Sequence, residues 1–278
     1  MTQTRPSCPP DVKRLLRQEA GFGCCRCGFP IYDYHHIVEY SSEHHFRPKD
    51  MMLLCPNCHR MASNGALSVK QQREFKTNPH NRNVGYANGQ LTINQVDFVV
   101  SSGGVDFVGG QSILLVDGES LLALGSSQSG SLLLSATLYN NQDQVVAQII
   151  DNEWISSNSD IWDLEAGFQY MVIRNGIRDL ALTVDARCDP IQIHAKLWRK
   201  GCQIVMSNQG VQLAGPMHRI VSFKDLCLVD LAINIDTVSW NVSISPMSPE
   251  GTGVIVSNPN HDERIHNGID AYHRARSS

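Results

Sequence analysis

Two Cys-x-x-Cys pairs constrain this chain more than any other feature of its sequence. Cys24 and Cys27 form the first pair, and Cys55 and Cys58 form the second. The two-residue spacing lets both sulfurs of one tight turn face a single ion, and four thiolates make the closed tetrahedral site of structural zinc. The sequence therefore predicts a structural Zn²⁺ that joins the two turns. Cys25 is a possible substitute ligand, although its adjacency to Cys24 strains the geometry.

The number and placement of the cysteines also bear on the cellular compartment. The chain has nine cysteines, and six of them lie within the first 58 residues. An odd number without a secretion signal argues against a disulfide framework, and clustered cysteines in such a chain more often bind metal. The first thirty residues have no apolar run of signal-peptide length, and no stretch reaches the roughly 18–20 apolar residues of a membrane helix. These observations predict a cytoplasmic protein.

Charge is distributed unevenly along the chain. Residues 1–90 hold 12 Lys and Arg against 7 Asp and Glu, whereas residues 91–278 hold 11 against 20. A basic N-terminal part on an acidic remainder suits an anionic partner for that part. A solvated surface explains the same imbalance, so charge alone does not establish nucleic-acid binding. The apolar content of 42% is sufficient for a packed core and excludes a disordered chain.

The change in composition and hydrophobic pattern along the sequence predicts a multidomain protein. Over residues 1–80 we expect a small α+β domain, with helices at 10–20, 58–63 and 67–76 and an extended segment at 31–39. A Pro-, Asn- and Gly-rich stretch predicts a linker at residues 81–90. Short apolar runs separated by turn signals over residues 91–246 predict an all-β domain, either a sandwich or a β-solenoid. Residues 247–278 have the composition of a polar tail with room for one short helix from Asp262.

Three histidines lie close to the cysteine pairs. His35 and His36 are adjacent in the expected extended segment, and His59 directly follows the second pair. Neighbouring side chains of a strand point to opposite faces, so His35 and His36 have different roles. Neutral imidazole, with an ordinary pKa of about 6.5, can take a proton from water. A divalent ion would stabilise the transition state of phosphodiester hydrolysis. The pattern therefore predicts that one histidine binds a cation and that another takes a proton from water.

The run CCRCGFPIYDYHHIVEY, followed by FRPKDMMLLCPNCHR, resembles the HNH endonucleases with a zinc-stabilised ββα-metal fold. The resemblance covers about residues 8–80. It implies that His35 is the first metal ligand, that His36 is the general base that activates water, and that His59 is the last histidine of the metal site. It also implies double-stranded DNA as the substrate and Mg²⁺, Mn²⁺ or another divalent ion as the catalytic cofactor.

This sequence departs from the family pattern at two positions. Asp50 stands where the family has Asn, and Ser63 stands where many relatives have a further histidine. Asp keeps an acceptor oxygen but gains charge and loses the amide donors. Asp50 is therefore either a metal ligand or the mark of an altered site. With Asp50 as a ligand, the catalytic residues expected from the resemblance are His35, His36, His59 and Asp50.

Basic residues surround the motif and are candidate phosphate contacts, which position DNA without reading its bases. Nothing in the motif reads a base sequence, so we expect a nuclease of low sequence specificity. The candidate phosphate contacts are Arg26, Arg47, Lys49 and Arg60.

An unrestrained nuclease of low specificity would damage its host. We therefore expect the acidic β domain to restrain the nuclease domain, to sense a regulatory ligand or protein, or to form a homo-oligomer, by analogy with phage-defence effectors. Two other functions stay open. Asp50 favours a catalytically inactive, zinc-stabilised DNA-binding module, and the acidic balance of residues 91–278 favours a protein-interaction adaptor.

Overall fold

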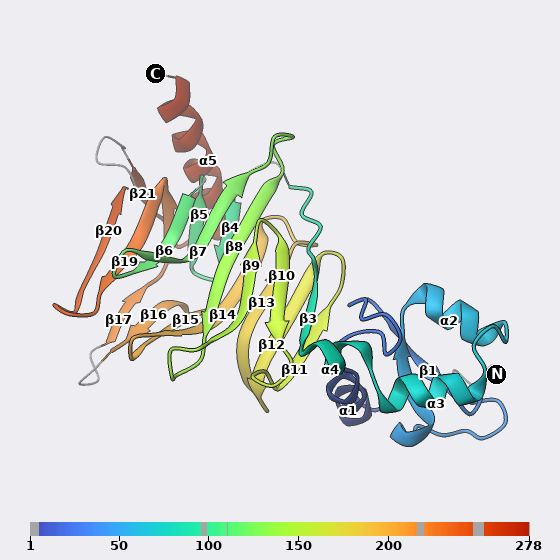
Figure 1. The fold of residues 1–278 in the computed structure, drawn as a ribbon. Helices are drawn as coiled ribbons and strands as arrows, with labels where there is room; N and C mark the ends of the chain where they lie inside the picture. The colour runs from blue at the N-terminus through green and yellow to red at the C-terminus, as the bar shows by residue number, and fades with distance from the viewer. Residues whose placement is uncertain (1–5, 96–98, 110, 216–219, 247–252, 278) are drawn as a thin grey trace. The chain divides into compact units, whose positions relative to one another are not determined.

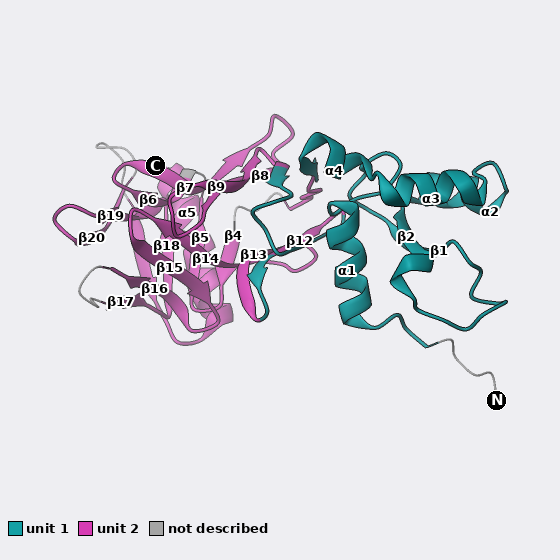
Figure 2. Cartoon of the chain, turned by 60° about the horizontal axis from the view of Figure 1, so that its bottom comes forward, with its two compact units in different colours: residues 1–89, 155–167, 174–177 teal, residues 90–154, 168–173, 178–278 magenta. Residues whose placement is uncertain are grey.

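A computed structural model describes residues 6–95, 99–109, 111–215, 220–246 and 253–277 (Figure 1). The chain divides into two compact units (Figure 2). Unit 1 comprises Met1–Gly89, Ile155–Gly167 and Arg174–Ile177, and unit 2 comprises the rest. Unit 1 is therefore discontinuous in sequence, because it takes two segments from the middle of the β-rich region. Among the described residues, no helix is long and apolar enough to cross a membrane.

The first 90 residues contain the helices of unit 1 and a two-stranded antiparallel sheet. The expected helix at 10–20 is found at those residues, where proline suits the first turn and Gly21, with a φ of 67°, ends the helix. The elements are α1 (Pro10–Ala20), β1 (Asp33–His36), the 3-10 helix η1 (Pro48–Asp50), β2 (Met51–Leu54), α2 (Pro56–Ser63), α3 (Val69–Thr77), α4 (His80–Val84) and β3 (Tyr86–Gln90).

The core of unit 1 is built around β2, whose four residues are all buried. β1 pairs with β2 so that His35 lies opposite Met52 and His36 lies opposite Met51. The buried strand therefore fixes the position of the strand that carries both histidines. The buried apolar residues of this core are Leu16, Ala20, Cys24, Cys25, Ile37, Met51, Met52, Leu53, Leu54, Cys55, Cys58, Ala62 and Leu67.

The expectation of a linker at residues 81–90 is wrong, because these residues form most of α4 and all of β3. Asn81 is buried, and its amide nitrogen donates to the carbonyl oxygens of Gly21, at 2.9 Å, and Gly28, at 3.3 Å. Pro79 precedes α4, and Gly85, with a φ of 86°, ends it. The Pro-, Asn- and Gly-rich composition therefore reflects helix ends and a buried amide.

The rest of the chain is β-rich, as predicted, and forms several sheets. The strands are β4 (Val99–Ser102), β5 (Val105–Val108), β6 (Gln111–Val116), β7 (Glu119–Ser126), β8 (Leu132–Tyr139), β9 (Val145–Ile150), β10 (Glu153–Ser157), β11 (Asp163–Ala166), β12 (Tyr170–Gly176), β13 (Asp179–Asp185), β14 (Ile191–Arg199), β15 (Cys202–Ser207), β16 (Gly210–Ala214), β17 (Ile220–Phe223), β18 (Leu226–Val229), β19 (Leu231–Asp236), β20 (Asn241–Pro246) and β21 (Val254–Ser257).

These strands form two large sheets. The eight-stranded sheet has the order β20-β19-β6-β7-β8-β9-β10-β3. The eleven-stranded sheet follows β11-β12-β13-β14-β4-β5-β18-β21, and β15, β16 and β17 branch from β14. Within unit 2, β8 and β14 contact each other across the two sheets, and burial alternates along both strands. The sheets thus pack face to face there, which favours a sandwich over a solenoid.

Residues 247–278 were expected to be a polar tail with one short helix from Asp262; the helix is found, but the described part is not a tail. It contains β21 and the 17-residue helix α5 (His261–Ser277). Arg264 of this helix is 1% exposed, and its Nε donates to Asp106 Oδ2 at 2.7 Å. Ala271 packs with Val99 and Val108 in one buried cluster. The helix is therefore part of the core of unit 2, and its polar composition is misleading because one of its buried side chains is an ion-paired arginine.

Candidate active site

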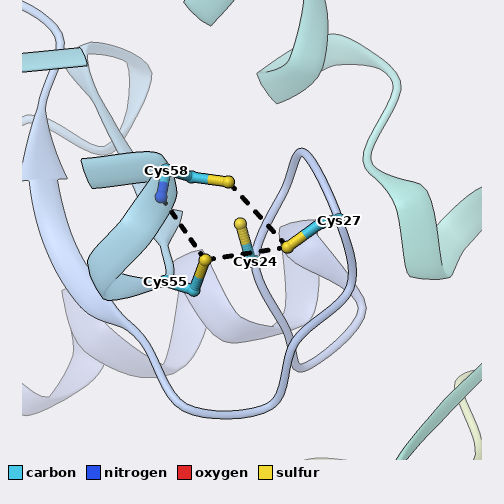
Figure 3. A group of neighbouring side chains, drawn as sticks. All are labelled: Cys24, Cys27, Cys55 and Cys58. Atoms are coloured by element: carbon cyan, nitrogen blue, oxygen red, sulfur yellow. Dashed lines mark hydrogen bonds between the residues drawn. The ribbon is translucent and has the colours of Figure 1, made fainter. Parts of the chain in front are cut away.

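Four cysteine sulfurs meet at the start of α2, as Figure 3 shows. The ligand atoms of Cys24, Cys27, Cys55 and Cys58 all lie within 4.8 Å of one another. The sulfur of Cys27 is 3.7 Å from that of Cys55 and 3.9 Å from that of Cys58. A tetrahedral zinc with Zn–S distances of about 2.3 Å requires sulfurs about 3.8 Å apart. The donor set and its spacing thus fit the structural zinc that the sequence predicts.

The backbone shapes both cysteine turns. The N–H of Gly28 donates to the carbonyl oxygen of Cys24 at 2.8 Å, which closes the first turn. Cys55 is the N-cap of α2, and its sulfur accepts the N–H of Cys58 at 3.5 Å. Burial raises the pKa of the Cys24 and Cys58 thiols, whereas at Cys55 hydrogen bonds outweigh burial and lower the pKa. A bound zinc ion would hold all four cysteines as thiolates.

Cys25 does not take part in this cluster, so the possible substitution of Cys24 by Cys25 is not observed. Among the described residues, the metal-donor group consists of Cys24, Cys27, Cys55 and Cys58. Cys25 is 3% exposed, and its N–H donates to the carbonyl oxygen of Leu53 at 2.9 Å. Burial raises the pKa of its thiol to about 11. Cys25 is therefore an inert core residue that ties the first turn to β2.

The three predicted histidines line one pocket of about 660 Å³ in unit 1. β1 supplies His35 and His36. α2 supplies His59, which directly follows the zinc ligand Cys58. The ring centroids of His35 and His59 lie 4.9 Å apart, edge to face. Ser63 also lines the pocket, at the position where many HNH sequences carry a histidine. The structure thus brings together the histidines that the sequence predicts.

His35 is oriented by Gln72 of α3. The Nε2 of His35 lies 3.0 Å from Gln72 Oε1, while the amide nitrogen of Gln72 donates to the carbonyl oxygen of Leu67 at 2.9 Å. The amide oxygen therefore accepts from His35, so the proton of the neutral ring is on Nε2 and Nδ1 carries the lone pair that can bind a cation. Burial lowers the pKa of His35, and nearby His59 lowers it further. The neutral ligand form is thus favoured.

Sequence reasoning did not single out Gln72. The residue is 5% exposed and is the buried residue of the nine-residue helix α3. A buried side-chain amide requires hydrogen-bond partners, and this requirement points to a specific contact. The available signal was a glutamine at an inward-facing position of a short helix. That signal identifies no partner, because Gln72 lies 37 residues from His35.

His36 contacts the loop that follows β1. Its Nε2 lies 3.0 Å from the carbonyl oxygen of His45, and its ring packs against Tyr40 and Phe46. A carbonyl oxygen only accepts, so the neutral ring of His36 carries its proton on Nε2. The lone pair, and hence the basic nitrogen, is Nδ1.

Asp50 does not occupy the place expected of a metal ligand. Its Oδ2 accepts from Arg47 Nε at 2.8 Å, and its Oδ1 accepts from Arg73 Nη2 at 2.7 Å. Hydrogen bonds from Arg73 and Arg47 lower the pKa of Asp50 to about 2. Among the described residues, Asp50 forms no three-donor metal group with His35 and His59. A carboxylate pairs with two guanidinium groups better than an amide does, which accounts for Asp at this position.

The candidate phosphate contacts are dispersed. Arg26 Nη1 lies 3.7 Å from the sulfur of Cys58, and Arg47 is paired with Glu43 and Asp50. Lys49 and Arg60 are exposed. Of these four described basic residues, none is among those that line the histidine pocket. Arg26 and Arg47 thus have local partners within the protein, and Lys49 and Arg60 are exposed cations.

The hairpin β1–β2, helix α2, the cysteine cluster and the histidine pocket together define a zinc-stabilised ββα site. Residues 24–65 match the family model described as HNH endonuclease. This match spans both cysteine pairs and all three histidines, although it covers well under half of the chain. Unit 1 therefore contains a zinc-type HNH domain. No curated protein and no solved structure matches the chain.

Proposed function

We propose that unit 1 is a metal-dependent endonuclease that hydrolyses phosphodiester bonds of DNA. The match to the HNH family supports a nuclease-type domain. The observation that carries the finer proposal is the placement of His35, His36 and His59 in one pocket beside the cysteine cluster. Neither a structural zinc nor a plain DNA-binding surface requires these three imidazoles.

In the proposed reaction, His36 is the general base. Its Nδ1 takes a proton from the attacking water, and the carbonyl oxygen of His45 holds the Nε2–H, which keeps the ring in this tautomer. The same carbonyl stabilises the imidazolium that forms. Replacement of a positioned general base typically costs about 10²–10⁴-fold in rate.

His35 and His59 would hold the catalytic divalent ion. Two neighbouring imidazoles, one with its Nδ1 oriented by Gln72, suit such an ion. The ion, when bound, supplies charge stabilisation to the phosphate and to the leaving oxygen. Imidazole nitrogen binds first-row transition-metal ions, with Mn²⁺ at the weak end of that series, whereas Mg²⁺ takes oxygen ligands. We therefore expect Mn²⁺ to support faster cleavage than Mg²⁺.

Double-stranded DNA is the proposed substrate, and Lys49 and Arg60 are the proposed phosphate contacts. Both side chains are exposed, whereas Arg47 is held by two carboxylates and Arg26 lies at the cysteine cluster. Contacts to phosphates position DNA without reading bases, so the proposed cleavage has low sequence specificity.

Plasmid cleavage tests this proposal. The full chain is incubated with Mn²⁺, Mg²⁺ or EDTA, and its zinc content is measured in the same samples. We expect metal-dependent nicking that falls at least about 100-fold in His36→Ala. His266→Ala is the matched control, because His266 lies on α5 with a 77% exposed side chain. Full activity of His36→Ala would refute the general base. A folded, zinc-loaded protein without cleavage under any metal would instead support the inactive DNA-binding module.

A further inference from the structure

A segment far from the HNH motif in sequence belongs to the same compact unit. Residues 155–167, here named the return segment, lie in the β-rich region but are part of unit 1 (Figure 2). Asn158 of this segment donates from its amide nitrogen to the carbonyl oxygen of Asn81 at 2.6 Å. The carbonyl oxygen of Trp162 accepts from Gln18 at 2.7 Å. The return segment thus packs on α1 and α4.

The central contact is a buried ion pair between α1 and the return segment. The Nε and Nη2 of Arg17 donate to the two carboxylate oxygens of Asp163 at 2.7 and 2.6 Å. The side chains of Arg17 and Asp163 are 5% and 2% exposed. Burial by itself lowers the pKa of Arg17, but the hydrogen bonds with Asp163 outweigh it and leave the pKa raised. The pair is therefore charged and bidentate, and its geometry is tightly defined.

The third donor of the same guanidinium reaches β1, the strand that carries His35 and His36. Arg17 Nη1 donates to the hydroxyl oxygen of Tyr34 at 2.7 Å. Tyr34 lies on β1 directly before His35 and is among the residues that line the pocket. A continuous series of short hydrogen bonds therefore runs from Asp163 through Arg17 to Tyr34.

A role in stability alone does not account for this arrangement. A buried ion pair is often no more stabilising than apolar residues of similar volume, since desolvation offsets the attraction. What the planar guanidinium adds is direction, because all three of its donating nitrogens have partners at fixed angles. The group fixed in this way is the strand of the metal-site histidine.

We propose that Asp163 is a positioning residue of the HNH site. It acts through Arg17 on Tyr34 and thereby holds β1, with His35 and His36, in its position at the pocket. The inference rests on the proposed nuclease function and extends it. The HNH site is then complete only when the return segment is in place. Misplacement of a reacting group by about 1 Å costs up to about 100-fold in rate, so a small shift of β1 has a measurable effect.

Three single variants of the full chain, together with the double variant Tyr34→Phe/Asp163→Asn, test the proposal. Tyr34→Phe removes only the hydroxyl group and leaves the Arg17–Asp163 pair in place. Asp163→Asn weakens the pair itself. Glu165→Gln is the matched control, because Glu165 lies 3.4 Å from the same guanidinium but is 36% exposed. The measurements are kcat and KM for DNA cleavage, Mn²⁺ affinity by calorimetry, and amide hydrogen exchange of residues 33–37.

We expect Tyr34→Phe and Asp163→Asn each to lower kcat about tenfold while KM for DNA stays within about twofold. Mn²⁺ affinity should fall and exchange over residues 33–37 should accelerate in both. The double variant should be little worse than Asp163→Asn, since both substitutions break one series of contacts. Glu165→Gln should match the parent protein in all three measurements.

The opposite outcome is equally defined. Tyr34→Phe with unchanged kcat, Mn²⁺ affinity and exchange would overturn the proposal, even if Asp163→Asn fails to fold. If the parent protein does not cleave DNA, the proposed function fails, but Mn²⁺ affinity and exchange over residues 33–37 still decide whether Asp163 and Tyr34 position β1.

Discussion

The two units of this protein are stabilised in different ways. Unit 1 has a small apolar core around β2, a four-cysteine cluster and a buried Arg17–Asp163 pair. Unit 2 relies on long strands with alternating buried residues, and its described part contains no second group of metal donors. A short chain segment without a large sheet buries too little apolar surface to fold alone, so it requires cross-links. The comparison teaches that the same chain combines a cross-linked site with a self-supporting scaffold.

Zinc removal should separate the units most clearly. Structural zinc contributes about 10–16 kcal/mol in small zinc domains, so a chelator or Cys58→Ala should unfold unit 1. We expect zinc content to fall and amides of residues 51–63 to exchange rapidly, while amides of β7 and β8 stay protected. Hydrogen exchange with mass spectrometry measures both regions at once. Loss of protection in β7 and β8 as well would show that the units are not independent.

A cavity in the core of the β-rich unit should destabilise unit 2 and leave unit 1 folded. Leu122 of β7 is 1% exposed and lies opposite Ala136 of β8. Leu122→Ala should lower the free energy of unfolding of unit 2 by about 2–5 kcal/mol and leave the zinc content unchanged. Urea denaturation followed by circular dichroism gives the value. Val238→Ala is the control, since Val238 is 94% exposed and its loss should cost almost nothing.

A helix cap in unit 1 should have a smaller effect. Ser68 and Gln71 form a capping box at the start of α3, the helix that carries Gln72. Ser68→Ala should lower the stability of unit 1 by about 1 kcal/mol, because the N–H of Gln71 loses its acceptor. Thermal melting of the zinc-loaded protein measures the change. Ser68→Asp keeps an acceptor and should melt close to the parent; equal losses in both variants would contradict the capping role.

Acid titration should show the smallest effect, in unit 2. Hydrogen bonds from Lys200 and from Thr237 lower the pKa of Asp117 to about 2, below its ordinary 3.8. The unfolded chain therefore binds more protons between these values, so the contribution of Asp117 is complete above pH 3.8 and declines as pH falls toward 2. Asp117→Asn should flatten the pH dependence of unfolding in this window. An unchanged dependence of the unfolding free energy on pH would show that Asp117 does not contribute to the loss of stability in acid.

Local sequence spacing predicted the parts of the site that are local in the chain. The cysteine pairs, the adjacent histidines on β1 and the helix at 10–20 each depend on residues a few positions apart, and the structure shows all three. Whether the histidines carry out catalysis stays a prediction. So do the expected regulation, homo-oligomer formation and defence role of the β domain.

Contacts between distant positions were not predictable in the same way. Asp50 looked like a metal ligand because its second partner, Arg73, lies 23 residues away on α3. Asp163 lies 146 residues from Arg17, and no periodicity or motif connects them. A fragment ending at residue 85 would therefore lack the partner of Arg17, although the sequence places a domain boundary there. Composition misassigned residues 81–90 for a related reason, since Asn81 is buried by contacts with Gly21 and Gly28.

The discontinuity of unit 1 also sets an order of events during synthesis. A ribosome that has made the cysteine pairs and the histidines has not yet made Asp163, and the unit extends to Ile177. Roughly 90 further residues separate Gly89 from Ile177, which take on the order of 5–20 s to add at cellular elongation rates. A nascent chain thus carries the whole HNH motif for several seconds before it can form the whole HNH unit. Completion of the site is timed by translation of the β-rich region.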